Sequence, residues 1–470
     1  MRLYIEPLRH RGERRVLAID SAKSRGHGMW EAMSLANRVV SSGTVSPRCR
    51  SGFARVAFCS LWLFVFAIPS ENGFMISGVG TAARLIGVVA FALTVAGTLE
   101  TGRIRPPGLG LFVLCLFAVL VTMSYAWSFD PSATGAKAVT CAQLLTFAWL
   151  VWEHCRGERE QVLLMKAFVF GTVVSGADTV ARFLRHQETG FQRFAGASLN
   201  PNDLGLCMAM SIPLSYFLSL RSGRVMTWFY RIQIMLAAAT ILLTASRTAL
   251  LAGVVAIGVV PVVHWKAASR RRFANLAFTI ALIVVAVLLA PEYSLKRLST
   301  ISAEVSGGTL DSRTTIWRAG LELFPLHPLL GIGAGAYPEL VAPVIGRPIE
   351  GSFVAHNTFL SVLVEEGVIG FGIFCWALAL LVAAIRTMPP LRRVCWAMVL
   401  AVWAVGVMAG TWEYYKETWF LFSMVLASCC RQLPESRSPR GDWHLWRVTR
   451  TELRDRAAFA AGRPTNNPAG

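Results

Sequence analysis

The sequence has 470 residues, of which 54% are hydrophobic and only 16% are charged. A soluble protein of this size usually carries about 25% charged residues, so the composition excludes an ordinary soluble domain. The net charge is +19, but no soluble segment carries a basic stripe with interleaved aromatic residues, so we predict no nucleic-acid partner.

Twelve apolar segments follow one another along the chain. A helix of about 20 residues spans the hydrocarbon core of a bilayer, so the pattern predicts an all-α polytopic membrane protein with about twelve transmembrane helices. The expected segments are 53–69, 77–98, 108–127, 135–152, 161–181, 203–220, 227–244, 248–265, 273–290, 357–385, 391–410 and 414–430. Only the Thr244–Arg247 turn separates the seventh and eighth segments, which predicts a helical hairpin there.

The apolar segments divide the chain into three parts. We expect a basic N-terminal tail over residues 1–55, a transmembrane domain over 56–430, and a basic C-terminal tail over 431–470. The first tail is too long and too charged to be a signal peptide.

The basic residues follow the positive-inside rule if both tails are cytoplasmic. Fourteen Lys and Arg residues then fall in five short cytoplasmic loops: Arg103, Arg105, Arg156, Arg159, Arg221, Arg224, Arg231, Lys266, Arg270, Arg271, Arg272, Arg386, Arg392 and Arg393. The opposite short loops hold few. This asymmetry predicts a multi-pass membrane protein with both termini in the cytoplasm, and the basic charge adds an attraction to anionic membrane lipids.

One loop on the opposite, periplasmic side is long, about residues 291–356. Asp311 or Ser312 is a candidate helix cap, and Pro325 and Pro328 would end the helix. Apolar residues recur between them at helical spacing, at Ile316, Trp317, Gly320, Leu321 and Phe324. The loop therefore predicts an amphipathic helix of about three turns.

Several arginines on the periplasmic side oppose the topological bias. Arg247 lies between two apolar segments and Arg193 precedes Asn200-Pro201-Asn202, whereas Arg313 and Arg318 lie on the expected loop helix. A guanidinium suits bidentate phosphate binding, so one interpretation is a diphosphate site. The competing interpretations are loop salt bridges and snorkelling to the interface.

His356 ends the long loop, directly before the tenth apolar segment. Its pKa near neutrality suits proton transfer, although an isolated interfacial histidine is more often structural. Glu365 and Glu366 lie within that tenth segment, and at least one of them should face protein. Arg84 and Asp178 also fall within apolar runs and are a possible pair.

Neither a metal nor a cofactor is predicted. The ten cysteines are scattered and form no CxxC pair, and the periplasmic loops contain no DxD motif. The glycines at 331, 333 and 335 form a GxGxG run that follows a helix rather than a strand, so we interpret it as a tight turn instead of a dinucleotide site.

With these motifs the chain resembles the O-antigen ligase and polymerase superfamily of bacterial envelope glycan enzymes. Four stretches carry the resemblance: Arg193-Phe-Ala-Gly with Asn200-Pro201-Asn202; Leu243-Thr-Ala-Ser-Arg247 with Leu251; Arg313-Thr-Thr-Ile-Trp317 through Gly333; and His356-Asn357 followed, after nine residues, by Gly367-Val-Ile-Gly370. The fourth is the most specific for ligases. The resemblance covers about residues 55–430.

The resemblance implies a metal-independent glycosyl transfer on the periplasmic face. The donor would be a glycan on undecaprenyl diphosphate, and the acceptor a sugar hydroxyl on lipid A-core. His356 would activate the acceptor, and Arg193 and Arg247 would hold the diphosphate. The expected substrate-binding residues are Arg313, Arg318, Asn357 and Asn202.

Three alternatives stay open. An O-antigen or exopolysaccharide polymerase would use the same chemistry with a lipid-linked acceptor. A protein O-oligosaccharyltransferase would be expected to carry an extra periplasmic domain, which the sequence lacks. A transporter or flippase for lipid-linked sugars would usually show a repeat in hydropathy, and none is clear here.

Overall fold

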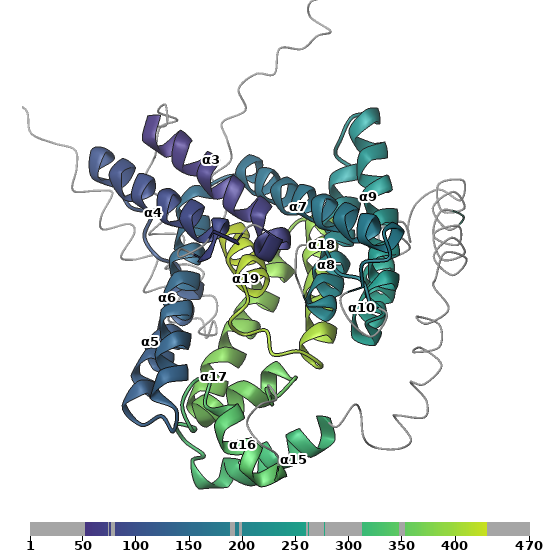
Figure 1. The fold of residues 1–470 in the computed structure, drawn as a ribbon. Helices are drawn as coiled ribbons and strands as arrows, with labels where there is room; N and C mark the ends of the chain where they lie inside the picture. The colour runs from purple at the N-terminus through teal and green to yellow at the C-terminus, as the bar shows by residue number, and fades with distance from the viewer. Residues whose placement is uncertain are drawn as a thin grey trace, which may run out of the picture. The chain divides into compact units, whose positions relative to one another are not determined.

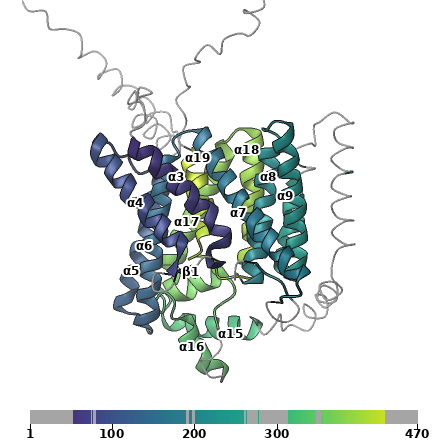
Figure 2. The same cartoon turned by 45° about the horizontal axis from the view of Figure 1, so that its top comes forward.

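The computed structural model describes residues 52–73, 75–76, 80–188, 193–196, 200–259, 262, 277, 313–346 and 353–429. These residues belong to one compact unit that begins at Gly52 and are almost entirely helical (Figures 1 and 2). A short antiparallel hairpin, β1 (Met75–Ile76) and β2 (Gly80–Thr81), interrupts them. The predicted tails fall almost wholly outside the described residues.

Eleven of the twelve predicted apolar segments contain a described helix. These helices are α3 (Gly52–Ala67), α4 (Ala82–Thr101), α5 (Leu109–Met123), α6 (Pro131–His154), α7 (Glu158–Leu184), α8 (Pro201–Ser219), α9 (Arg224–Leu243), α10 (Arg247–Ile257), α17 (Thr358–Thr387), α18 (Pro390–Val407) and α19 (Lys416–Cys429). The ninth predicted segment lies outside the described residues except at position 277. Within the described part of the chain, seven helical segments are long and apolar enough to cross a membrane, so a multi-pass membrane protein is confirmed, whereas the count of twelve remains a prediction.

The connections between these helices alternate between two ends. Among the described residues, the loop end is formed by 68–73, 75–76, 80–81, 124–130, 193–196, 200, 244–246, 313–346, 353–357 and 408–415. Hydrogen bonds join these connections directly: Phe129 N donates to Ile332 O, Phe194 N to Leu243 O, and Ser175 Oγ, near the end of α7, to Pro69 O. Figures 1 and 2 show α17 passing between α5–α6 on one side and α8–α10 on the other, with α15 and α16 at the loop end.

The opposite end holds those basic residues of the predicted cytoplasmic loops that lie in the described part of the chain. Arg221 pairs with Glu158, and Arg105 donates to the carbonyl oxygen of Trp152. Arg392 donates to Gln161. The predicted separation of basic loops from the His356 loop is therefore present in the fold, and which end faces the cytoplasm remains a prediction.

Helix α8 is the buried centre of one half of the bundle. Nearly all its side chains from Leu204 to Ser219 are buried, as expected for a helix that is apolar on every side. Helices α9 and α10 both pack on α8 and contact each other less. The predicted turn between them is present, but α8 supports both arms of the predicted hairpin.

Helix α17 is broken at Gly367, whose φ is +67°. The glycine run at 331–335 closes this break: Ile332 N and Gly333 N donate to the carbonyl oxygens of Val364 and Glu365. Two bonds return from α17, where Val368 N and Ile369 N donate to Pro328 O and Leu329 O. The predicted tight turn is confirmed, and it satisfies backbone groups that a broken membrane helix leaves open.

The expected loop helix is α15 (Arg313–Leu323), which is three turns long and is followed by a 3-10 turn at Phe324–Leu326. Its buried face is Ile316, Ala319 and Gly320, whereas Leu321 is 52% exposed, contrary to its expected place on the apolar face. A second helix, α16 (Tyr337–Ile345), was not predicted. The two helices meet where Tyr337 Oη donates to Ile316 O at 2.9 Å, beside Gly320.

Candidate active site at the loop end

The Arg193–Gly196 segment holds Arg193 against the end of α9. Phe194 N donates to Leu243 O at 3.1 Å, and Gly196 N donates to Thr179 Oγ1 at 2.9 Å. A Cβ on Gly196 would lie 2.7 Å from Ser175 O, so only glycine permits this close approach to α7. These hydrogen bonds thus hold the backbone of the Arg-Phe-Ala-Gly motif in place and so position the guanidinium of Arg193.

The Arg193 side chain reaches the turn that carries Arg247. Its Nε donates to Thr244 O at 2.8 Å, and its Nη2 donates to Asn202 Oδ1 at 2.7 Å. Arg247 follows three residues after Thr244, as the first residue of α10. The structure therefore joins Arg193 to Asn202 and to the turn that leads into Arg247, and it gives Asn202 the role of orienting Arg193.

The backbone at this turn is strained. Ala245 has φ +47°, a left-handed conformation that costs a residue with a Cβ about 1 kcal/mol or more. Ser246 then caps α10 by accepting from Ala249 N at 3.3 Å. The strain fixes the direction in which the chain enters α10 and so the position of Arg247.

His356 occupies a second strained position, with φ +47°. It is half-buried and directly precedes Asn357, whose Oδ1 accepts from Phe359 N and Leu360 N at 3.0 and 3.1 Å. Asn357 is thus the N-cap of α17. The His-Asn pair therefore combines a constrained imidazole with the cap that fixes the helix behind it.

The loop helix brings a cation to this histidine. Trp317 Nε1 donates to Ala355 O at 2.7 Å, and Arg313 lies one helical turn before Trp317 on α15. Burial of the imidazole, with the positive charge of Arg313 as the second cause, lowers the pKa of His356 below its ordinary value. His356 is therefore mainly neutral near pH 7 and able to accept a proton. Arg318, in contrast, is exposed and lies about 100° around the helix from Trp317.

We call Arg193, Asn202 and the Thr244–Arg247 turn the Arg193 cluster, and residues 353–358 the His356 segment. The connection between α18 and α19 joins the two. Trp412 Nε1 donates to Asp203 Oδ1 at 2.8 Å, next to Asn202 in the first turn of α8. The backbone N of Trp412 donates to Thr358 Oγ1 at 2.8 Å, at the start of α17. Tyr415 stacks on Trp412 with ring centroids 5.1 Å apart and donates to Asp203 Oδ2 at 3.1 Å. Asp203, Trp412 and Thr358 thus form a continuous bridge between the Arg193 cluster and the His356 segment.

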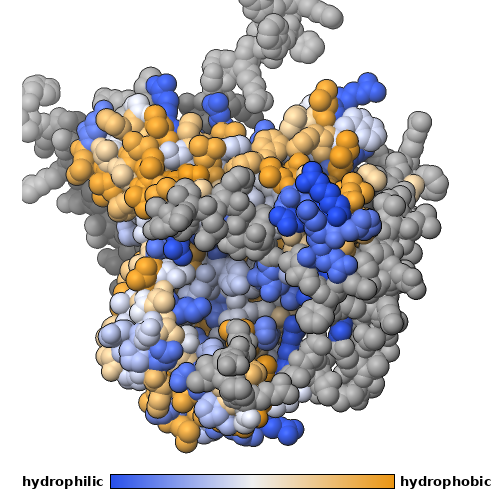
Figure 3. Space-filling view, in the orientation of Figure 1, coloured by the Kyte–Doolittle hydropathy of each residue, from blue (hydrophilic) through white to orange (hydrophobic). Residues whose placement is uncertain are grey.

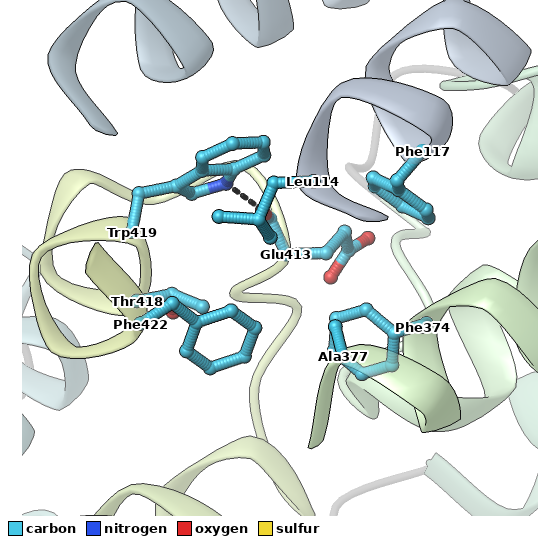
Figure 4. Close-up of a pocket in the computed structure, with 8 residues that line it drawn as sticks. All are labelled: Leu114, Phe117, Phe374, Ala377, Glu413, Thr418, Trp419 and Phe422. Atoms are coloured by element: carbon cyan, nitrogen blue, oxygen red, sulfur yellow. Dashed lines mark hydrogen bonds between the residues drawn. The ribbon is translucent and has the colours of Figure 1, made fainter. Parts of the chain in front are cut away.

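Glu413 faces inward from the same connection. Its Oε1 accepts from Ser361 Oγ at 2.8 Å, and its carbonyl oxygen accepts from Trp419 Nε1 at 2.8 Å (Figure 4). The carboxylate points into a small cavity of about 10 Å³ lined by apolar side chains, among them Phe117 and Phe374. Burial raises the pKa of Glu413 above its ordinary value, which favours the protonated acid.

Two further buried carboxyl groups lie on α17. Glu365 accepts from Gly335 N at 2.8 Å and Glu366 from Tyr414 Oη. Lys137 lies over the Tyr414 ring at 4.9 Å. Both glutamates are almost fully buried, which confirms the expectation that at least one of them faces protein. The predicted pairing of Arg84 with Asp178 is wrong, since Asp178 pairs with Arg182 of its own helix at 3.1 Å.

The loop end can attract an anion by two means. Helices α8, α10 and α17 all begin there, and each is capped by a side chain, from Asn200, Ser246 and Asn357. A helix N-terminus favours negative charge, and Arg193, Arg247 and Arg313 add full positive charges. In Figure 3 hydrophilic residues gather in the hollow at the centre of this face, below a hydrophobic rim.

Sequence reasoning missed the Thr411–Tyr415 segment and Asp203. A usable signal exists: five polar or aromatic residues, Thr-Trp-Glu-Tyr-Tyr, interrupt two apolar helices. Helix alternation would also have placed them at the same end as His356.

Among the described residues, no group of three or more His, Cys, Asp or Glu side chains is arranged to hold a metal ion, and the expectation that transfer is metal-independent remains a prediction.

Two comparisons find known sequences that are similar to this chain. A family model described as O-antigen ligase matches residues 232–375, which run from α9 through the His356 segment into α17. The chain is also 27% identical, over 278 residues, to the exopolysaccharide production protein ExoQ of Rhizobium meliloti (strain 1021). That match covers 54% of this chain and 60% of the relative, so the chain spans about three fifths of the curated relative's length.

Proposed function

We propose that this chain belongs to the O-antigen ligase and polymerase superfamily, as both comparisons support. It transfers a glycan from undecaprenyl diphosphate to a sugar hydroxyl, at the loop end of its helices and on the periplasmic face of a bacterial inner membrane. The observation that carries the proposal is the hydrogen-bonded bridge from the Arg193 cluster to the His356 segment through Asp203, Trp412 and Thr358. It ties an anion-binding cluster to a neutral imidazole in one rigid unit.

In this mechanism the acceptor oxygen attacks the anomeric carbon of the donor. His356 takes the proton of the hydroxyl as the new glycosidic C–O bond forms, and the bond from the anomeric carbon to the diphosphate oxygen breaks. The diphosphate leaves with the bonding electron pair, and Arg193 and Arg247 stabilise its charge. His356 then releases its proton to solvent or to the departing diphosphate. Direct displacement of this kind inverts the anomeric configuration.

Each of the other expected site residues has a place in this proposal. Arg313 keeps His356 neutral through its positive charge, and Asn357 holds the histidine through the cap of α17. Asn202 orients Arg193 as a positioning residue. The exposure of Arg318 favours a contact with the glycan rather than with the diphosphate.

The acceptor defines two candidate functions. A ligase would use lipid A-core, and a polymerase would use a second lipid-linked glycan. The relative ExoQ is named for exopolysaccharide production, which favours the polymerase as the second candidate. In cells, loss of a ligase would leave the core bare while lipid-linked polymer accumulates, whereas loss of a polymerase would still let single repeats reach the core.

The direct test uses purified protein in lipid nanodiscs with an undecaprenyl-diphosphate glycan and either lipid A-core or a second lipid-linked glycan. We expect His356→Ala to lower transfer by about 10²–10⁴-fold, since general-base catalysis contributes that much. The matched control is His327→Ala, because His327 is exposed and its ring packs only on Phe129 among the described rings. Full activity of His356→Ala, with normal insertion, would contradict the proposal.

A further inference from the structure

A groove lies between α4 and α6, away from the Arg193 cluster. Its volume is about 280 Å³. One wall is a stripe of α4 that includes Arg84, Gly87, Val88 and Phe91, and the other is a face of α6. The main packing partners of α4 are α3 and α6, whereas the Arg193 cluster is built on α8, α9 and α10. The groove is therefore a separate site.

The groove is mainly apolar and open to the side, and Thr140, Gln143 and Thr146 are the polar members of its α6 wall. Phe64, Leu144 and Phe147 form a buried floor, whereas Val88 and Phe91 are 64% and 42% exposed at its edge. Helix α4 has the smallest buried share of the seven candidate membrane spans, so this edge faces lipid. A side-open apolar groove on a lipid-facing helix can take up an acyl or prenyl chain directly from the bilayer.

The mouth of the groove is cationic. Lys416 lies there, but it pairs with Glu71, which also accepts from Thr81 Oγ1. Arg84 is exposed in the third position of α4, and in the described part of the chain it forms no ion pair with a carboxylate. An arginine within an apolar run needs a partner or a ligand, so the net positive charge at this mouth fits a phosphate group.

The size of the groove limits the class of lipid. Sites for drug-sized ligands have about 300–1,000 Å³, so 280 Å³ has room for a segment of one hydrocarbon chain. The lining also includes Tyr414, which donates to Glu366 and lies in the connection that bridges the Arg193 cluster and His356. A lipid whose phosphate sits at this mouth therefore presents its headgroup beside the candidate active site.

We propose that this groove binds the prenyl chain of a second polyprenyl-phosphate lipid, the one that carries the acceptor glycan, with its phosphate at Arg84. The inference rests on the proposed function, since it assigns the acceptor of the same transfer. It makes the acceptor lipid-linked, as a polymerase requires.

The test measures binding independently of transfer. Wild-type protein in nanodiscs is exposed to an undecaprenyl phosphate probe with a photoreactive group in its chain, and the labelled peptides are identified. We expect labelling within Ala82–Thr101 and Pro131–His154, competed by undecaprenyl diphosphate and not by excess phosphatidylglycerol. Equal competition by phosphatidylglycerol would identify an ordinary lipid contact and overturn the proposal.

Matched variants locate the site. Gly87→Leu should fill the groove and lower labelling by about tenfold or more, whereas Gly372→Leu should not, because a side chain there meets open space. A Cβ on Gly87 would lie 3.1 Å from the Phe64 ring, so Val88→Trp provides a second block at an exposed edge. Arg84→Ala should weaken labelling about fivefold, and Arg386→Ala, at the opposite end, should not. Unchanged labelling in Gly87→Leu and Val88→Trp would overturn the assignment.

Transfer assays separate this inference from the proposed function. Wild-type protein that is labelled in the groove but forms no glycosidic bond would contradict the proposed function and leave the lipid site in place. Transfer to a second lipid-linked glycan at an unchanged rate in Gly87→Leu would contradict the acceptor assignment and leave the transfer chemistry in place.

Discussion

The contact between the glycine run and the break in α17 gives a sharp stability prediction. Gly331 has φ +71°, and a Cβ there would lie 2.3 Å from Glu365 O and 2.6 Å from Gly367 N. Gly331→Ala therefore adds left-handed strain, about 1 kcal/mol, and forces two backbone segments apart. Four hydrogen bonds join these segments: Ile332 N to Val364 O, Gly333 N to Glu365 O, Val368 N to Pro328 O, and Ile369 N to Leu329 O, at 2.9–3.2 Å.

The size of the effect follows from those bonds. If the alanine Cβ breaks two of the four, each costs about 1–2 kcal/mol because its buried groups have no water to replace the partner. The expected loss in the free energy of unfolding is about 3–5 kcal/mol. Gly346→Ala is the matched control, since Gly346 also has a positive φ, +68°, but a Cβ there would meet open space. This variant should lower the free energy of unfolding by only about 1 kcal/mol.

The assay is equilibrium unfolding of purified protein in mixed micelles of dodecyl maltoside and SDS, followed by circular dichroism. The midpoint of Gly331→Ala should move clearly below that of Gly346→Ala, and Gly346→Ala should stay close to wild type. Equal midpoints for the two variants would refute the reasoning, because backbone strain alone would then explain both losses.

Three further predictions concern the site. Arg247→Lys should lower transfer about tenfold or more, because an ammonium cannot present two parallel donors to a phosphate; a fully active lysine variant would favour mere snorkelling. Arg313→Ala should raise the pKa of His356, whose lowered value partly reflects that charge. The acid limb of kcat/KM should then move to higher pH, and an unmoved limb would separate Arg313 from the histidine. In thermal melts, Glu413→Gln should reduce the loss of stability that wild type shows as pH rises from the ordinary carboxyl pKa towards the raised pKa of the folded state, because folding favours the protonated acid; identical wild-type and Gln profiles would contradict this.

The helices and the sites of several turns could be predicted from local pattern. Apolar runs located eleven described helices within a few residues, because burying side chains in lipid requires about 20 consecutive apolar residues whatever their neighbours are. Arg193, Arg247, Arg313 and His356 could likewise be singled out, since charged or titratable residues that oppose the topological bias are few.

The contacts among those residues could not be predicted in the same way. Trp412 bonds Asp203, 209 positions away, and Thr358, 54 positions away, and no periodicity within either helix encodes such a pairing. Leu321 was expected on the apolar face of α15 but is exposed, because Tyr337 of the unpredicted α16 packs beside Gly320 and sets which face is covered. The pairing of Arg84 with Asp178 failed for a similar reason, since Asp178 has Arg182 one helical turn away.

The sequence by itself determined that this is a multi-pass helical membrane protein, that its basic loops are separated from the His356 loop, and that the glycine run at 331–335 forms a tight turn. Only the tertiary structure decided that the Arg193 cluster and His356 share one bridge, and that α4 and α6 leave a groove with Arg84 at its mouth. The physical reason is range. Hydropathy and backbone conformation act within a helix or a turn, whereas the position of a side chain relative to a distant one depends on how whole helices pack.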